Sequence, residues 1–175
     1  MDGRYRFELL ARHHNRSAFS CGTEELDLYL RQHAGQDARR YVAAIHVLYD
    51  PTADLIAGFY TLNAASIEPG AVRSIILGLP RYPSLPAILL GRLAVDNSYR
   101  GQGLGELLLL NALRRSLAIT EQVAAVAVIV DAKNDNARGF YRHFGFQSMA
   151  DDADRFILSM ANIDRTYGPR RSVNP

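Results

Sequence analysis

Short stretches rich in hydrophobic residues occur along the first half of the chain, and turn-forming residues separate them. Such stretches predict β-strands. Three of them precede residue 70: Arg6–Leu10, Tyr41–Leu48 and Leu55–Ile67. The composition of Asp50–Asp54 is typical of a turn, which indicates that the second and third strands are joined there.

Between the first two strands, the hydrophobic positions change to the spacing of a helix. Leu26, Tyr29, Leu30 and His33 recur at intervals of three and four residues, so they share one helix face. Thr23 stands where a capping residue is expected, and two glutamates follow it in the first turn. We therefore expect a helix that begins after Thr23 and buries this face.

The second half of the chain alternates strand and helix patterns. It predicts strands at Ala87–Asp96, Val123–Asp131, Phe146–Met149 and Arg155–Met160, and helices at Leu104–Leu117 and from the cap Asn134 to His143. Gly145 is placed to end the second helix in a left-handed conformation. The segment Gly78–Pro86 holds three prolines and is expected to be a loop or extended, because proline removes backbone donors. This order predicts an α/β or α+β fold around a central mixed sheet.

Composition narrows the class of protein. The chain has 175 residues, 48% of them hydrophobic, which suits one domain with a real core and argues against disorder. Its single cysteine, Cys21, excludes an internal disulfide and a cysteine-based zinc site. No apolar run approaches the roughly 20 residues of a membrane helix, and the first residues do not resemble a signal peptide. We expect a soluble cytoplasmic domain.

Arginine dominates the basic residues, since Lys133 is the one lysine among 20 lysines and arginines. The planar guanidinium binds phosphates through paired hydrogen bonds, which lysine cannot do. The net charge is only +2, so the chain is not a general binder of polyanions. Codon bias is the alternative reason for the excess, and the positions of the arginines must therefore decide their role.

A glycine-rich segment, Arg100–Gly105, links a predicted strand directly to a predicted helix. Glycines in this place allow close approach of a ligand, and the free amides at the helix start favour an anion such as a pyrophosphate. A P-loop is excluded because no lysine lies nearby, and the Rossmann spacing fails because its third glycine would fall on Glu106. The alternative is a tight turn without a ligand.

Two motifs in the second half resemble those of the GCN5-related N-acetyltransferases, the GNAT superfamily. RGQGLG, preceded by LLGRLAVDNSY, is similar to the acetyl-CoA loop of that superfamily. Asn134, Ala137 and the segment Phe140–Phe146 are similar to its second motif and follow at the expected distance. The resemblance implies a mostly antiparallel twisted sheet of six to seven strands, flanked by helices, with a splayed strand pair at the cofactor site.

Further matching positions extend the resemblance over about Phe7 to Met160; they are His14, Phe19, Cys21–Gly22, Leu26–Asp27, Leu30, Ala57–Tyr60, Ile88–Asp96, Val130–Ala132 and Phe140–Tyr141. With them, the chain most resembles the tRNA-acetylating GNAT toxins of type II toxin–antitoxin modules. The resemblance implies an acetyltransferase domain over residues 1–161 and a tail over residues 162–175 whose role and flexibility stay open. It further implies that the acetyl group passes to the α-amino group of aminoacyl-tRNA, which blocks translation. The implied partners are a second copy of the chain and a ribbon-helix-helix antitoxin, with DNA bound only through the antitoxin complex.

The resemblance also assigns roles to individual residues. Backbone groups of the strand and the glycine loop, together with Asn134, would bind acetyl-CoA; the strand and loop residues are Leu93, Ala94, Val95, Arg100, Gly101, Gln102, Gly103, Leu104, Gly105 and Glu106. Tyr141 would be the general acid that protonates the departing thiolate, because a phenol is protonated at neutral pH. Without the motif around it, Tyr141 would be interpreted as an aromatic residue of the hydrophobic core.

Arg92, Arg138 and Arg142 are candidate contacts to tRNA phosphates, with solvated surface charge as the alternative. The matched motifs contain no general base, which favours an α-amino acceptor, since part of an α-amine is already neutral near pH 7. No metal is expected, because His13 and His14 lack a carboxylate or thiolate at ligand spacing in the sequence. Acetylation of a small amine or a protein N-terminus, and a non-catalytic CoA-binding module, remain the alternative functions.

Overall fold

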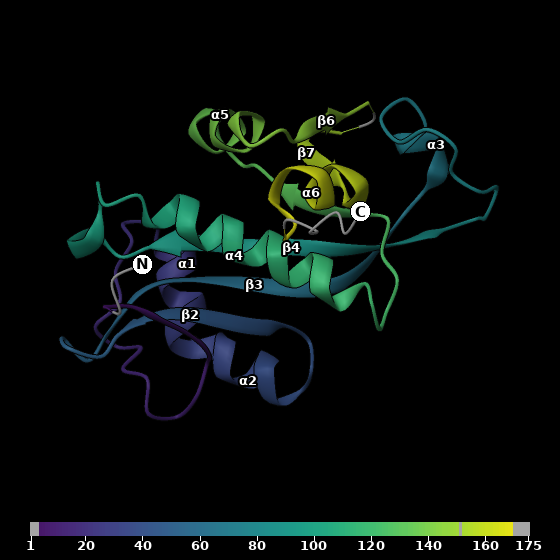
Figure 1. The fold of residues 1–175 in the computed structure, drawn as a ribbon. Coiled ribbons are helices and arrows are strands. Elements are labelled where there is room, and N and C mark those ends of the chain that lie inside the picture. Colours follow the sequence, from purple (N-terminus) through teal and green to yellow (C-terminus); the bar gives the residue numbers. More distant parts are fainter. Residues whose placement is uncertain (1–3, 151, 170–175) are drawn as a thin grey trace, which may run out of the picture. The chain divides into compact units, whose positions relative to one another are not determined.

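The computed structural model describes residues 4–150 and 152–169, and its seven strands follow the sheet order β1-β2-β3-β4-β5-β7-β6 (Figure 1). The chain divides into two compact units, of residues 1–63 with 90–112 and of residues 64–89 with 113–175. Two strands, β3 (Leu55–Ile67) and β4 (Leu85–Val95), contribute residues to both units, as does helix α4 (Leu104–Ile119). The mixed α/β architecture predicted from the sequence is confirmed.

The first unit is built on an antiparallel meander. Strand β1 (Arg6–Leu9) pairs with β2 (Ala44–Asp50), which pairs with β3, and each pair is antiparallel. Two short helices, α1 (Glu24–Leu28) and α2 (Ala34–Arg39), connect β1 to β2. Their buried residues pack with those of the strands in one hydrophobic cluster that includes Phe19, Tyr29, Leu30, Ala34, Ile45, Val47, Ile56, Phe59 and Ala94.

A π-helical segment, Tyr29–His33, joins α1 to α2 and changes the predicted helix face. In this segment the backbone N–H of Ala34 bonds to the carbonyl of Tyr29, one residue farther than in an α-helix. The extra residue turns His33 toward solvent and buries Ala34 in its place. The expectation that His33 shares the buried face is therefore wrong. Thr23 does occupy the N-cap, but its side chain makes no capping bond.

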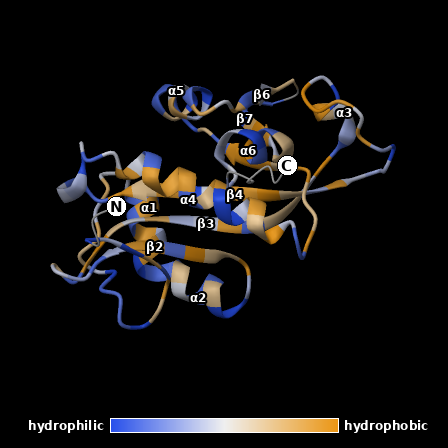
Figure 2. Ribbon diagram, in the orientation of Figure 1, coloured by the Kyte–Doolittle hydropathy of each residue, from blue (hydrophilic) through white to orange (hydrophobic). Residues whose placement is uncertain are grey.

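The second unit pairs β5 (Ala127–Asp131) with β7 (Asp152–Ser159) and β7 with β6 (Gln147–Met149), again antiparallel. Its helices are α3 (Pro69–Val72), α5 (Asp135–His143) and α6 (Met160–Tyr167). The core of this unit joins β5 and β7 to residues near α3, including Ile67, Val72, Leu85, Ile129 and Ile157. Helix α5 is mainly hydrophilic (Figure 2) and buries Tyr141.

Most strand boundaries differ from the sequence prediction by a few residues; β7, for example, spans Asp152–Ser159 and not Arg155–Met160, because Met160 already begins α6. Strand β2 begins at Ala44 and not at Tyr41, because the helical segment continues to Arg39 and a turn follows in which Tyr41 adopts a φ of 57° and is 95% exposed. Strand β5 begins at Ala127, because the backbone of Val123 still bonds to Ile119 at the end of α4. In contrast, β3 spans the predicted Leu55–Ile67.

The predicted tail is helical in its first part, because α6 continues to Tyr167, whereas residues 170–175 lie outside the described residues. The domain boundary at residue 161 stays a prediction. Among the described residues, no helix combines the length and the apolarity needed to cross a membrane.

Candidate active site

The glycine loop of the first unit has the backbone conformation that an anion site needs. Gly101 and Gly103 have φ angles of 76° and 72°, and α4 begins directly afterwards at Leu104. No atom lies within 4 Å of a Cβ added at either glycine, so glycine is required here for its conformation and not for space. The loop glycines and Gln102 are exposed. The loop leads into the first turn of a 16-residue helix, whose first backbone N–H groups have no partner within the helix and favour a phosphate group.

Arg100 connects this loop to the start of α1. Its Nη2 donates to the carbonyl oxygen of Cys21 at 2.6 Å, and it lies close against Gly22, where an added Cβ would be 3.2 Å from the same nitrogen. The left-handed φ of Gly22, 82°, fits this close approach. The side chain of Arg100 therefore fixes the base of the loop, and its predicted contact with the cofactor stays a prediction.

Two buried aspartates, which the sequence reasoning missed, hold the same region. Asp96 directly follows β4 and accepts from the backbone N–H groups of Ser98 at 2.9 Å and of Ser20 at 2.8 Å. Asp27 on α1 accepts from the backbone N–H of Cys21 at 2.7 Å. Burial alone would raise the pKa of Asp27, but hydrogen bonds from Cys21 and Ser20 outweigh it and lower the pKa. Asp96 followed by Ser98 is an Asx-turn signal that the sequence does contain.

The strand residues assigned to the cofactor, Leu93 to Val95, are packed against β3. Gly58 on β3 makes this close packing feasible, because a Cβ there would lie 2.8 Å from the carbonyl oxygen of Ala94 and 2.7 Å from Cδ1 of Leu108. The backbone N–H of Asp96 also bonds to Ala57 at 2.9 Å. Leu93, Ala94, Val95 and the loop residues 100–106 are therefore brought together in the first unit.

Arg92, one residue before this set, packs on an aromatic ring. Its guanidinium carbon lies 3.6 Å from the ring centre of Tyr29, within cation–π range. The hydroxyl of Tyr29 donates to Asp37 at 3.1 Å. Burial raises the pKa of Tyr29 to about 12, and the bond to Asp37 adds to this rise, whereas the charge of Arg92 opposes it. Arg92 is thus held in one place, and its contact with RNA stays a prediction.

In the second unit, Asn134 and Tyr141 lie on or next to α5, as the sequence predicts. The Oδ1 of Asn134 accepts from the backbone N–H of Ala137 at 2.9 Å, which is a regular N-cap. Tyr141 is 8% exposed and packs edge-on against Phe140 and Phe146, with ring centres 5.3 and 5.4 Å away. Burial raises the pKa of Tyr141 to about 12, so this phenol is protonated at neutral pH.

The two arginines of α5 differ in their surroundings. Arg138 donates to Asp135 at 2.6 Å and also to Asp154, and these carboxylates raise its pKa. Arg142 has its guanidinium carbon 5.3 Å from the ring centre of Phe156. Since two carboxylates already balance its charge, Arg138 has less to offer a phosphate than Arg142 has.

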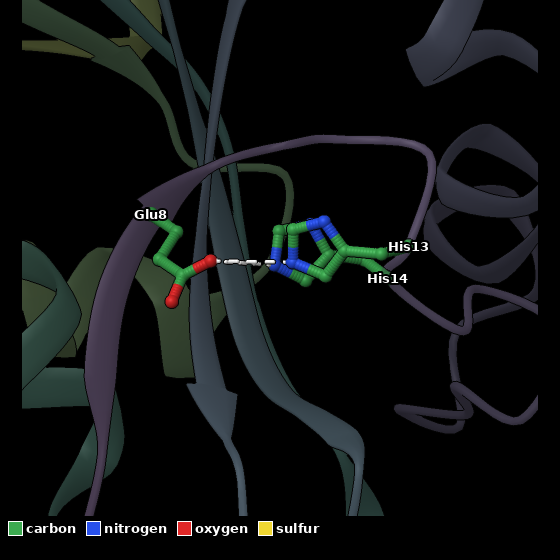
Figure 3. Close-up of side chains that lie close together, drawn as sticks. All are labelled: Glu8, His13 and His14. Atoms are coloured by element: carbon green, nitrogen blue, oxygen red, sulfur yellow. Dashed lines mark hydrogen bonds and ion pairs between the residues drawn. The ribbon is translucent and has the colours of Figure 1, made fainter.

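A carboxylate and two histidines also meet in the first unit (Figure 3). The Oε2 of Glu8 lies 3.2 Å from Nε2 of His14 and 3.4 Å from Nε2 of His13. The expectation that these histidines lack a neighbouring carboxylate is wrong, because β1 carries Glu8 alongside them. Within residues 4–150 and 152–169 this is the one group of at least three such side chains at metal-ligand distances.

The hydrogen bonds of His14 favour a proton on the nitrogen that a metal would need. The backbone N–H of Ala11 donates to Nδ1 of His14 at 2.9 Å, so the neutral ring carries its proton on Nε2, directed at Glu8. A metal on Nε2 would need the other tautomer and would break the bond to Ala11. Burial, followed by the nearby His13, lowers the pKa of His14 and favours this neutral ring. We interpret the group as a hydrogen-bonded cluster.

Comparisons with known proteins agree on one family. The family model for the acetyltransferase (GNAT) domain matches residues 41–148. A curated relative named "tRNA-acetylating toxin", from Mycobacterium tuberculosis, is 34% identical over 156 residues, which cover 87% of this chain and 90% of the relative.

Solved structures of the toxin AtaT share the fold. AtaT complexed with acetyl-methionyl-tRNAfMet matches with a TM-score of 0.85 and 27% identity over 92% of this chain and 98% of that one. A tyrosine-to-phenylalanine mutant of AtaT bound to the C-terminus of the antitoxin AtaR matches with a TM-score of 0.82 and 25% identity, over 95% and 99%. AtaTR bound with AcCoA matches with a TM-score of 0.81 and 28% identity, over 94% and 98%.

Proposed function

Because the chain belongs to the GNAT family of acetyltransferases, we propose that it acetylates the α-amino group of aminoacyl-tRNA and so acts as a translation-blocking toxin. Its activity is that of an acetyl-CoA-dependent N-acetyltransferase. The observation that carries this conclusion is the pair of left-handed glycines, Gly101 and Gly103, at the start of α4, inside the matched region. Two comparisons support this proposal: a relative that is 34% identical is named a tRNA-acetylating toxin, and the structure of AtaT was solved in complex with acetyl-methionyl-tRNAfMet.

Acetyl-CoA fits the first unit through its pyrophosphate. Acetyl-CoA supplies the acetyl group as a thioester. The backbone amides of Gly101 to Gly105 would bind the pyrophosphate, with Glu106 in the first helical turn and the Arg100–Cys21 bond fixing the base of the loop. Leu93, Ala94 and Val95 would offer backbone groups to the pantetheine arm, and Asn134 would add a contact to the cofactor. A backbone amide of this strand would polarise the thioester carbonyl.

Tyr141 would hold and deliver the proton that the leaving thiolate needs. A buried phenol with a pKa of about 12 keeps its proton at neutral pH and donates it as the carbon–sulfur bond breaks. The acceptor needs a neutral amine. An α-amino group, whose pKa is near ~7.7–8.0, is partly neutral without a protein base, whereas a lysine side chain near ~10.4 is not. The chemistry of the matched motifs therefore suits aminoacyl-tRNA.

We further propose the assembly that goes with a toxin of this type. A second copy of the chain and a ribbon-helix-helix antitoxin are the expected partners, and DNA is bound only through the antitoxin complex. AtaT bound to part of its antitoxin AtaR supports an antitoxin partner here. A cytoplasmic location follows from a substrate that is tRNA.

The test is acetyl transfer from labelled acetyl-CoA by the purified chain and its Tyr141→Phe variant. Aminoacyl-tRNA, the same tRNA without its amino acid, a small primary amine and a peptide with a free N-terminus are offered in parallel. We expect labelling of aminoacyl-tRNA alone, and a loss of turnover in Tyr141→Phe of about 100-fold or more while CoA binding persists. Labelling of the small amine or the peptide in place of aminoacyl-tRNA would contradict the proposed substrate and identify that amine or peptide as the acceptor. The absence of any turnover would indicate a CoA-binding module without catalysis.

A further inference from the structure

Tyr5, just before β1, reaches the middle of the glycine loop. Its hydroxyl donates to Oε1 of Gln102 at 2.9 Å, although the two residues are 97 positions apart in the sequence. The ring of Tyr5 also packs edge-on against Tyr99, with ring centres 6.1 Å apart. Arg4 covers the Tyr5 ring, its guanidinium carbon 5.0 Å from the ring centre. The segment before the first strand thus contacts the loop directly.

Asp50, at the end of β2, is the buried base of the same network. Its Oδ2 accepts from the hydroxyl of Tyr99 at 3.1 Å and lies 3.4 Å from a guanidinium nitrogen of Arg4. Its Oδ1 accepts from the backbone N–H of Thr52 at 3.0 Å. Burial alone would raise the pKa of Asp50, but these hydrogen bonds and the charge of Arg4 outweigh it and hold the pKa below its usual value. We call Arg4, Tyr5, Asp50 and Tyr99 the tyrosine clasp.

The sequence of the loop explains why such a clasp matters. Gln102 stands between Gly101 and Gly103, and glycine is the residue with the greatest backbone freedom. Because the two glycines have no side chain, a contact to the side chain of Gln102 is what can fix the centre of the loop. A loop whose amides are ordered before binding loses less conformational entropy when a phosphate arrives. The bond from Tyr5 to Gln102 supplies this order from the segment just before β1, where Tyr99 and Arg4 pack against the Tyr5 ring.

We propose that Tyr5 is a positioning residue that raises the affinity for CoA by holding Gln102, and with it the amides of the glycine loop, in the anion-binding conformation. This inference rests on the proposed function, since the ligand of the loop is taken to be the pyrophosphate of CoA. Tyr5 acts through Gln102 and does not touch the ligand itself. The affinity of the loop is therefore partly set by a hydroxyl outside the sequence motif.

The test uses Tyr5→Phe, which keeps the ring packed on Tyr99 and beneath Arg4 and removes only the hydroxyl. We expect the Kd for CoA and the KM for acetyl-CoA to rise about 2- to 10-fold, the effect of one hydrogen bond, with kcat at saturating acetyl-CoA unchanged. Gln102→Ala should give a similar rise, and the double variant should be no weaker than the single ones. The matched control is Tyr41→Phe, because Tyr41 is a 95% exposed tyrosine of the same unit and should bind CoA like the unaltered chain.

A second readout separates this inference from the proposed function. Backbone ¹⁵N order parameters of Gly101 and Gly103, measured without ligand, should fall in Tyr5→Phe and stay unchanged in Tyr41→Phe. Equal order parameters and equal CoA affinity in Tyr5→Phe and the unaltered chain would overturn the clasp. A fall in melting temperature with unchanged CoA affinity would also overturn it, in favour of a purely structural role. If the unaltered chain bound no CoA, the proposed function would fail, whereas the order parameters would still report on the clasp.

Discussion

The contact between β3 and β4 at Gly58 leads to a prediction whose size follows from the structure. A methyl group at this position would lie 2.8 Å from the backbone oxygen of Ala94 and 2.7 Å from the Leu108 side chain. Leu108 can rotate away, but the Ala94 oxygen belongs to a strand and can move only with β4. About half an ångström of separation is needed to reach an ordinary contact, and β4 carries Leu93 to Val95.

Gly58→Ala should therefore destabilise the protein in spite of the entropy gained by replacing a glycine. Overpacking of a close contact costs about 1–3 kcal/mol, and the reduced freedom of the unfolded chain offsets about 0.4–1 kcal/mol of this. With the middle of each range, the free energy of unfolding should fall by ~1–2 kcal/mol, which lowers the melting temperature by about 2–8 °C for a chain of this size. The displacement of β4 should also raise the KM for acetyl-CoA.

Thermal and urea unfolding of Gly58→Ala and Gly139→Ala would check this reasoning. Gly139 lies within α5, and an added Cβ there meets no atom within 4 Å. Gly139→Ala should therefore stabilise the protein by about 0.5–1 kcal/mol, as alanine does in an open helix position. If Gly58→Ala unfolded at or above the melting temperature of the unaltered chain, the close contact would not constrain the fold and the reasoning would be refuted.

Three further predictions concern other residues of the site. Asn134→Ala should lose the α5 cap and about 1 kcal/mol of stability, whereas Asn134→Ser should keep the melting temperature. A lower CoA affinity of the serine variant, measured by calorimetry, would support a contact between Asn134 and the cofactor. An unchanged CoA affinity would mean that Asn134 serves only as the helix cap. Because the pKa of Asp50 is held below its usual value, the contribution of Asp50 to stability is present above pH ~4 and is lost as pH falls through the pKa of the folded state. In urea unfolding, the difference in free energy of unfolding between the unaltered chain and Asp50→Asn should therefore shrink toward pH 2. A difference that does not change with pH would contradict the lowered pKa of Asp50. Binding of aminoacyl-tRNA should weaken as the salt concentration rises. Arg142→Gln should weaken this binding more than Arg138→Gln does, because Arg138 is already paired with Asp135 and Asp154. Affinities that do not depend on salt in a filter-binding assay would contradict the phosphate-contact hypothesis.

The features that the sequence predicts correctly depend on local patterns. Leu55–Ile67 is one uninterrupted strand pattern after a turn, and its bounds are confirmed. The cap at Asn134 and the left-handed Gly145 also follow from residue type and position alone. The glycine loop was recognised by its spacing, and its two positive φ angles agree with that interpretation.

The contacts that hold the loop could not be predicted, because they join residues far apart in the chain. Nothing local to Arg100 indicates that it will donate to Cys21, and nothing local to Gln102 indicates Tyr5. The carboxylate partner of His13 and His14 was missed for the same reason, since Glu8 reaches them only once β1 has formed. Residue spacing also predicted the wrong buried residue, His33 in place of Ala34, because the hydrogen-bond pattern of the helix changes in Tyr29–His33.

The π-helical segment Tyr29–His33 makes the chain one residue longer than its helix face requires. Leu26, Tyr29 and Leu30 keep α-helical spacing, but the next buried position is Ala34, eight residues after Leu26 instead of seven. Deleting the exposed Gln32 would bring Ala34 into the seventh position and convert the segment to an ordinary α-turn. The widened turn accommodates one residue more than the buried face requires, so a change of one residue in chain length can be absorbed here without a change in the buried positions.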